Sequence, residues 1–224
     1  MVWRVFQQTA RYSLACLCGE CVAMKFHRIT EACVGGFDRW QRWVADHFGG
    51  KRPLLEHVVQ LGRYRLGLLR PFAEVTWPSV ERLVFVCHGN ICRSPYAEVV
   101  AREKHGVATV SFGIEAKTGV GANESAMRNA AIRQVDLTAH RATSRSDFVA
   151  RDNDLLVAME PRQGLVLQDM AERSTAKMQV TLLGLWAAQP RPHIADPYGC
   201  GDAYFQNCFG HIDAAVEGIV TRCR

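Results

Sequence analysis

Four short apolar runs in the second half of the chain constrain its fold more than any other feature. They cover residues 83–86, 109–112, 155–159 and 180–183, and segments of helical periodicity separate them. Short apolar runs that alternate with helices are typical of a parallel sheet covered on both faces. We therefore predict an α/β fold for residues 81–224, a doubly wound parallel four-stranded sheet with helices on both faces.

The final helix has the clearest periodicity. Its apolar residues recur at steps of three and four, and Asp202 stands where it can cap the helix start. The apolar side is formed by Phe205, Phe209, Ile212, Val216, Ile219, Val220 and Cys223.

Residues 1–80 differ in composition from the remainder of the chain. They contain 11 Lys and Arg against 6 Asp and Glu, whereas residues 81–224 contain 16 of each, and four of the five tryptophans also precede residue 80. The spacing predicts helices over about 3–26, over 37–48 before two glycines, and from Pro53 up to Pro71. We predict two parts: an α-helical extension and linker at 1–80, and a second domain at 81–224.

The sequence argues against membrane-spanning and secreted classes of protein. The stretch 13–24 is broken by Glu20 and falls short of the roughly 18 apolar residues that a spanning helix needs. Cys16 faintly resembles a lipidation site, but residues 7–11 before it are too polar for a signal core. Nine cysteines, an odd number, favour a reduced cytoplasmic setting over a disulfide framework.

The cysteines of residues 1–80 invite a metal interpretation. They are Cys16, Cys18, Cys21 and Cys33, with His27 between them. Zinc sites prefer paired Cys-x2-Cys spacings, and only one pair here has that spacing, so we favour helix packing and expect no metal. The basic, tryptophan-bearing character fits a solvated helical face, and contact with a membrane surface or an acidic protein stays open as an alternative. We expect no nucleic-acid partner.

The residues after the first apolar run carry the chemistry. The string runs Cys87, His88, Gly89, Asn90, Ile91, Cys92, Arg93, Ser94 and Pro95. A helical segment follows, and Pro95 suits its first position. A loop between a strand and a helix start presents backbone N–H groups to an anion. Arg93 can hold two phosphate oxygens with its planar fork, and the same surroundings stabilise a Cys87 thiolate. Thiolate and arginine together predict cleavage of phosphate monoesters through a cysteinyl-phosphate.

This string resembles the signature of the low molecular weight protein tyrosine phosphatases. Four later stretches, at 111–113, 136–142, 154–160 and 196–198, resemble the family in the same order. The resemblance covers most of residues 81–224 and none of residues 1–80. It implies a phosphatase domain at 81–224 that acts on phosphotyrosine in proteins and needs no cofactor.

The resemblance also implies roles for single residues. Cys87 is the expected nucleophile, Arg93 the phosphate clamp and Asp196 the acid that protonates the leaving group and then activates water. The expected phosphate-binding loop is His88, Gly89, Asn90, Ile91, Cys92 and Arg93, supported by Ser94, His140 and Tyr198. In this family a cysteine in the place of Cys92 can form a reversible disulfide with the nucleophile, and small apolar filler is the alternative.

Two features concern the substrate. Residues 114–121 contain no aromatic side chain, and Gly199 follows Tyr198 where the family often has a second tyrosine, so we expect a looser pocket. Ile91 favours phosphotyrosine, since relatives that act on phosphoarginine tend to have threonine there. The alternatives are a thioredoxin-coupled arsenate reductase, which would use Cys200, Cys208 or Cys223, and a non-catalytic phosphotyrosine-binding scaffold.

Overall fold

The computed structural model describes residues 36–223 of the chain. It divides into two units, Met1–Arg42 and Trp43–Arg224, and the second contains the whole sheet. A helix occupies residues 36–48 and ends before Gly49 and Gly50, as expected. The helix expected over 3–26 and the cysteines at 16, 18, 21 and 33 lie outside the described residues. The domain boundary at residue 80 stays a prediction.

The four expected strands form one parallel sheet. They are β1 (Arg82–Cys87), β2 (Thr109–Gly113), β3 (Asp154–Ala158) and β4 (Gln179–Leu182), in the order β2-β1-β3-β4. Val84 of β1 is in register with Val110 of β2 and with Leu156 of β3. The prediction of a parallel four-stranded sheet is therefore confirmed.

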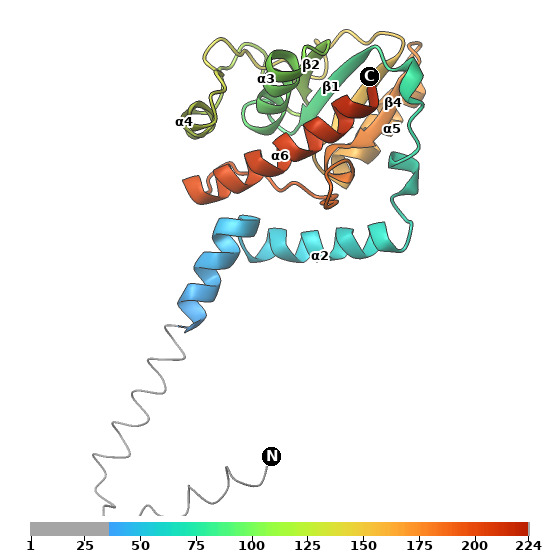
Figure 1. The fold of residues 1–224 in the computed structure, drawn as a ribbon. Coiled ribbons are helices and arrows are strands. Elements are labelled where there is room, and N and C mark those ends of the chain that lie inside the picture. Colours follow the sequence, from blue (N-terminus) through green and yellow to red (C-terminus); the bar gives the residue numbers. More distant parts are fainter. Residues whose placement is uncertain (1–35, 224) are drawn as a thin grey trace, which may run out of the picture. The chain divides into compact units, whose positions relative to one another are not determined.

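Helices cover both faces of the sheet (Figure 1). The main helices are α3 (Arg93–His105), α4 (Glu124–Ile132), α5 (Pro161–Arg173) and α6 (Asp202–Cys223). Alternate residues of β1 belong to different cores: Leu83 and Phe85 pack with α3 and α6, whereas Val84 and Val86 pack with α5. This alternation follows from the two-residue period of a strand, so the doubly wound architecture is also confirmed.

Two helix starts differ from the expectation. Helix α3 begins at Arg93, two residues before the expected start at Pro95. Pro95 is tolerated inside the first turn because the first four N–H groups of a helix have no intrahelical acceptor. Asp202 is the first residue of α6, where Phe205 N donates to Gly201 O, so Gly201 and not Asp202 holds the capping position. The Asp202 carboxylate instead accepts a hydrogen bond from Asn129 Nδ2 at 2.7 Å.

Helix α2 (Lys51–Arg65) precedes the sheet and contacts the second half of the chain. It begins two residues before Pro53 and ends at Arg65, close to the positive φ of 74° at Gly67. Glu56 pairs with Arg162 of α5 at 3.1 Å. Among the described residues no helix has the length and hydropathy to cross a membrane.

The connector between α2 and β1 contributes to the core. Two short 3-10 helices, Arg70–Phe72 and Trp77–Ser79, form part of it. Leu69 and Phe72 are buried with Val84 and Leu182, and Thr181 Oγ1 donates a hydrogen bond to Phe72 O at 2.6 Å. The chain therefore enters the packed interior before the first strand begins.

Candidate active site

The loop between β1 and α3 directs its amides toward its own centre. The carbonyl oxygens of Cys87, His88, Asn90 and Ile91 accept hydrogen bonds from donors outside the loop. The donors are Ile114 N, Glu115 N, His140 Nε2 and Asn123 N, at 3.0, 2.9, 2.8 and 2.9 Å. In a planar trans peptide the N–H points opposite to the C=O. The N–H groups of the residues that follow, His88, Gly89, Ile91 and Cys92, therefore face inward and form an anion site at a helix start.

Asn90 is buried and holds this loop together. Its φ of 52° lies in the left-handed region, which Asn tolerates better than most residues. Its side-chain amide donates to Ser94 Oγ at 2.8 Å and to Ser111 Oγ at 2.7 Å, and its Oδ1 accepts from Thr143 N at 2.8 Å. These three bonds connect the loop to α3, to β2 and to the segment that follows α4.

The same network orients the hydroxyl of Ser94. Ser94 Oγ accepts from Asn90, so its own proton is free to be donated to Cys87 Sγ, which lies 3.0 Å away. Asn90 N also donates to that sulfur at 3.3 Å. Two hydrogen-bond donors therefore face the sulfur.

Gly113 lets the loop lie directly against the end of β2. A Cβ atom at this position would come within 2.8 Å of both Asn90 N and His88 O. Any larger residue would therefore push the loop away from the sheet.

Arg93 is fully buried with one edge of its guanidinium engaged. Its Nη1 donates to Glu160 Oε1 and to Ile194 O, the latter at 2.8 Å. Its Nη2 lies 2.8 Å from Asp196 Oδ2, but neither Nη2 nor Nε has a hydrogen-bond partner of good geometry. Burial alone would lower the pKa of Arg93, yet Asp196 and Glu160 outweigh it and raise this pKa. A buried fork with two unsatisfied donors is suited to a bidentate phosphate.

A pocket of about 220 Å³ opens over the loop. The residues that line it are Cys87, His88, Gly89, Ile91, Cys92, Asp196 and Tyr198. The Asp196 side chain is 39% exposed and Tyr198 is 64% exposed, so both stand at the rim, whereas Cys87 is buried at the base. A carboxyl group thus stands beside the same pocket as the sulfur.

Comparison with known proteins decides the family. The model of the family "Low molecular weight phosphotyrosine protein phosphatase" matches residues 82–224. The chain belongs to this family. It is 33% identical over 147 residues to the "Probable low molecular weight protein-tyrosine-phosphatase EpsP" of Ralstonia nicotianae, which covers 65% of this chain and 97% of that protein. It is 38% identical over 119 residues to the phosphatase Wzb of Escherichia coli K12, which covers 53% and 78% of the two chains.

A solved structure agrees with the sequence comparisons. Vibrio vulnificus Wzb in complex with benzylphosphonate superposes with a TM-score of 0.54 at 28% identity, covering 63% of this chain and 98% of that one. The chain is accordingly a low molecular weight protein-tyrosine phosphatase with additional residues before its family domain.

The structure brings most of the expected site residues of this phosphatase together. Cys87 and Ser94 meet at the base of the pocket, Asp196 and Tyr198 stand at its rim, and Arg93 pairs with Asp196. His140 lies outside the ring and binds Asn90 O; burial lowers its pKa, so its neutral form is favoured. Among the described residues that line this pocket, Tyr198 is the only one of the types Phe, Tyr and Trp.

The other cysteines of the phosphatase are placed differently. Burial, with a smaller effect of Asp196 and of Cys87, raises the pKa of Cys92, so its thiol stays protonated. Cys208 is buried, and its pKa is raised to about 12, mainly by burial. Cys200 and Cys223 are partly buried. None of these last three lines the pocket over Cys87.

Two residues of the site were not singled out from the sequence. Glu160, which binds Arg93, was noted only as part of a strand that resembles the family. Its position two residues after the end of β3, at the carboxyl edge of the sheet, is the signal that marks it. Arg52 of α2 reaches the neighbourhood of Asp196, and no local pattern in the sequence points to it.

Proposed function

We propose that this phosphatase hydrolyses phosphotyrosine in proteins through a cysteinyl-phosphate on Cys87. The observation that carries the proposal is the buried Cys87 sulfur, which lies at the base of a ring of inward-facing amides. Arg93, at the end of the same loop, has two buried guanidinium nitrogens, Nε and Nη2, without a hydrogen-bond partner. Asp196 stands at the rim of the same pocket.

In the first step the thiolate attacks phosphorus. The S–P bond forms as the P–O bond to the tyrosyl oxygen breaks, and the leaving oxygen takes a proton from Asp196. Nε and Nη2 of Arg93 hold two of the phosphoryl oxygens while the loop amides hold the others. Ser94 supports the sulfur whenever it is anionic.

In the second step water replaces the sulfur. The Asp196 carboxylate takes a proton from water, the new O–P bond forms, and the S–P bond breaks to release inorganic phosphate and restore the thiolate. Before substrate binds, Asp196 lies against Nη2 of Arg93. A phosphoryl oxygen that takes this nitrogen displaces Asp196 and leaves it free to carry a proton.

Phosphotyrosine is supported as the substrate by the comparisons and by the pocket. Benzylphosphonate, bound by the Vibrio vulnificus relative, combines an aromatic ring with a phosphoryl-like group. The pocket of this chain has Ile91 and Tyr198 beside the loop, which can contact such a ring from its sides. The partner is therefore a phosphotyrosine-containing protein.

The cellular location and the domain organisation of the enzyme are also part of this proposal. A cytoplasmic location keeps the Cys87 thiol reduced, and the five described cysteines are unpaired. The family match at 82–224 supports a phosphatase domain at 81–224 and an extension at 1–80. Contact of the extension with a membrane surface or an acidic protein is supported by its excess of basic residues and by the exposure of Trp40 and Trp43.

The test is to trap the phosphoenzyme. Acid quenching during turnover of a ³²P-labelled phosphotyrosine peptide should leave label on the wild-type protein, and Cys87→Ser should carry no label and release no phosphate. Cys223→Ser is the matched control, since Cys223 is at the end of α6, and it should be labelled like the wild type. Label that persists in Cys87→Ser, or equal hydrolysis of phosphotyrosine, phosphoserine and phosphoarginine peptides, would contradict the proposal.

A further inference from the structure

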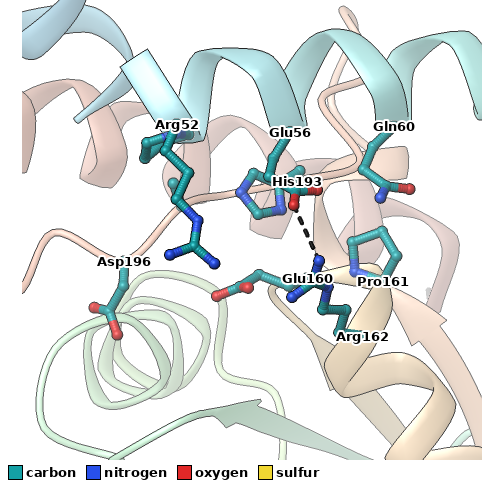
Figure 2. A pocket seen from close by; sticks show the side chains of 10 residues that line it. Arg52, Glu56, Gln60, Glu160, Pro161, Arg162, His193 and Asp196 are labelled. Atoms are coloured by element: carbon teal, nitrogen blue, oxygen red, sulfur yellow. Dashed lines mark hydrogen bonds and ion pairs between the residues drawn. The ribbon is translucent and has the colours of Figure 1, made fainter. Parts of the chain in front are cut away.

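A second pocket adjoins the pocket over Cys87. It has a volume of about 240 Å³, and Asp196 lines both pockets. One wall comes from α2 and the opposite wall from the start of α5 and the segment before Asp196 (Figure 2). The residues that line it are Arg52, Pro53, Glu56, Gln60, Glu160, Pro161, Arg162, His193, Ala195 and Asp196. Since α2 precedes the family match at 82–224, this wall is an addition to the family domain.

The three carboxylates of this pocket already have cationic partners. Glu160 and Asp196 both pair with the buried Arg93, and Glu56 pairs with Arg162 of α5 at 3.1 Å. A cationic ligand would therefore have to displace an existing ion pair.

Arg52 is the exception among the charged residues of the pocket. Within residues 36–223 its guanidinium forms no ion pair, and the residue is exposed. Figure 2 shows its side chain extending from α2 toward Glu160 and Asp196. An arginine that is free to bind presents a planar fork of donors to a carboxylate or a phosphate.

Two further features favour an anion in this pocket. His193 is only 9% exposed, and its ring makes no hydrogen bond to another described residue, so it retains a donor for a ligand. Burial lowers its pKa, which favours the neutral ring. The first turn of α2 contains no acidic residue, and Gly50 before it provides no side-chain cap, so the positive end of this helix is not neutralised locally.

We propose that this pocket is a substrate subsite in which Arg52 binds an anionic side chain close to the phosphotyrosine. The ligand is a carboxylate, or a second phosphorylated residue, of the same substrate segment. An extended peptide advances about 3.3 Å per residue, so a residue within about three positions of the phosphotyrosine can reach a pocket that shares Asp196. The subsite rests on the proposed function, because it needs phosphotyrosine in the pocket over Cys87.

The subsite gives α2 a role in the choice of substrate. Cys87, Arg93 and Asp196 act on the phosphoryl group alone and cannot distinguish one phosphotyrosine sequence from another. A cation beside the pocket adds an ion pair that only acidic sequences form, and such a partly exposed pair changes affinity by about two- to fivefold. The expected effect is therefore selectivity among sequences and not a gain in the chemical step.

The experiment compares phosphotyrosine peptides that differ only in charge. Each position from −3 to −1 and from +1 to +3 is occupied in turn by Glu or by Gln, and kcat/KM is measured by phosphate release. The full-length wild type should prefer Glu by about two- to fivefold at one position or more. The preference should vanish in Arg52→Gln, reverse in Arg52→Glu and persist in Arg65→Gln, a control at the far end of the same helix. In the wild type and in Arg65→Gln, the ratio of kcat/KM for the Glu peptide to that for the Gln peptide should decrease toward one as salt is raised.

Each other outcome has a definite meaning. A wild type that hydrolyses every peptide equally would overturn the subsite and leave the proposed function standing, whereas a wild type that hydrolyses none would overturn both. A preference that survives in Arg52→Gln and Arg52→Glu would also overturn the subsite. Free inorganic phosphate is the alternative ligand, because it also presents anionic oxygens to Arg52. It would show as second-site inhibition of p-nitrophenyl phosphate turnover that Arg52→Gln removes, and this result would overturn the assignment to a substrate side chain.

Discussion

Replacement of Asn90 by alanine should damage stability and activity together. The substitution removes three hydrogen bonds, two buried ones donated by the side-chain amide and a partly buried one accepted from Thr143 N. Each contributes about 1 kcal/mol, and alanine at a φ of 52° adds about 1 kcal/mol of backbone strain. The free energy of unfolding should therefore decrease by about 4 kcal/mol, and kcat/KM should fall because the amide ring loses its brace.

The matched control for this variant is Asn153→Ala. Asn153 also has a positive φ, 67°, but its side chain makes only an exposed hydrogen bond to Glu81. It should lose about 1 kcal/mol, almost all from backbone strain, and keep its activity. Urea denaturation followed by circular dichroism measures both losses. Equal losses for the two variants would refute the argument that the Asn90 hydrogen bonds stabilise the loop.

Two further predictions concern proton transfer and pH. Asp196→Ala should reduce hydrolysis of phosphotyrosine peptides far more than hydrolysis of p-nitrophenyl phosphate, whose leaving group needs no proton; equal reductions in kcat would exclude Asp196 as the acid. The pKa of His57 and that of His211 are lowered to about 4, first by burial and then by the charge of Arg191. The unfolded chain, in which histidine has a pKa near 6.5, therefore binds these protons first, and the free energy of unfolding should decrease as pH falls from about 6.5 to 4. Thermal unfolding across this range should show the decrease, and a His57→Gln, His211→Gln double variant should reduce it; an unchanged slope would contradict the assignment.

The features predicted correctly from sequence are those with local causes. The four strands follow from apolar runs, and the position of the loop follows from Cys87 at the end of β1 and Arg93 at the start of α3. A strand, a tight loop and a helix start are consecutive in the chain, so their geometry is encoded within about ten residues.

The features that could not be predicted depend on residues far apart in the chain. Asp202 was expected to cap α6, but Asn129 of α4 binds its carboxylate and Gly201 occupies the capping position. Arg52 and Asp196 line one pocket although 143 positions separate them, and neither shows a local pattern that indicates the other. Only the packing of α2 against the second half of the chain brings them together.

The burial of Leu69 and Phe72 has a consequence for any shortened form of this enzyme. The family match begins at residue 82, yet the interior of the protein begins at least thirteen positions earlier. A proteolytic fragment or an expression clone trimmed to the family boundary would leave a hole beside Gly164, against which the Phe72 ring now lies. Such a fragment would keep every catalytic group and still be a less stable protein. The stability of the catalytic domain therefore depends on residues that precede the family match.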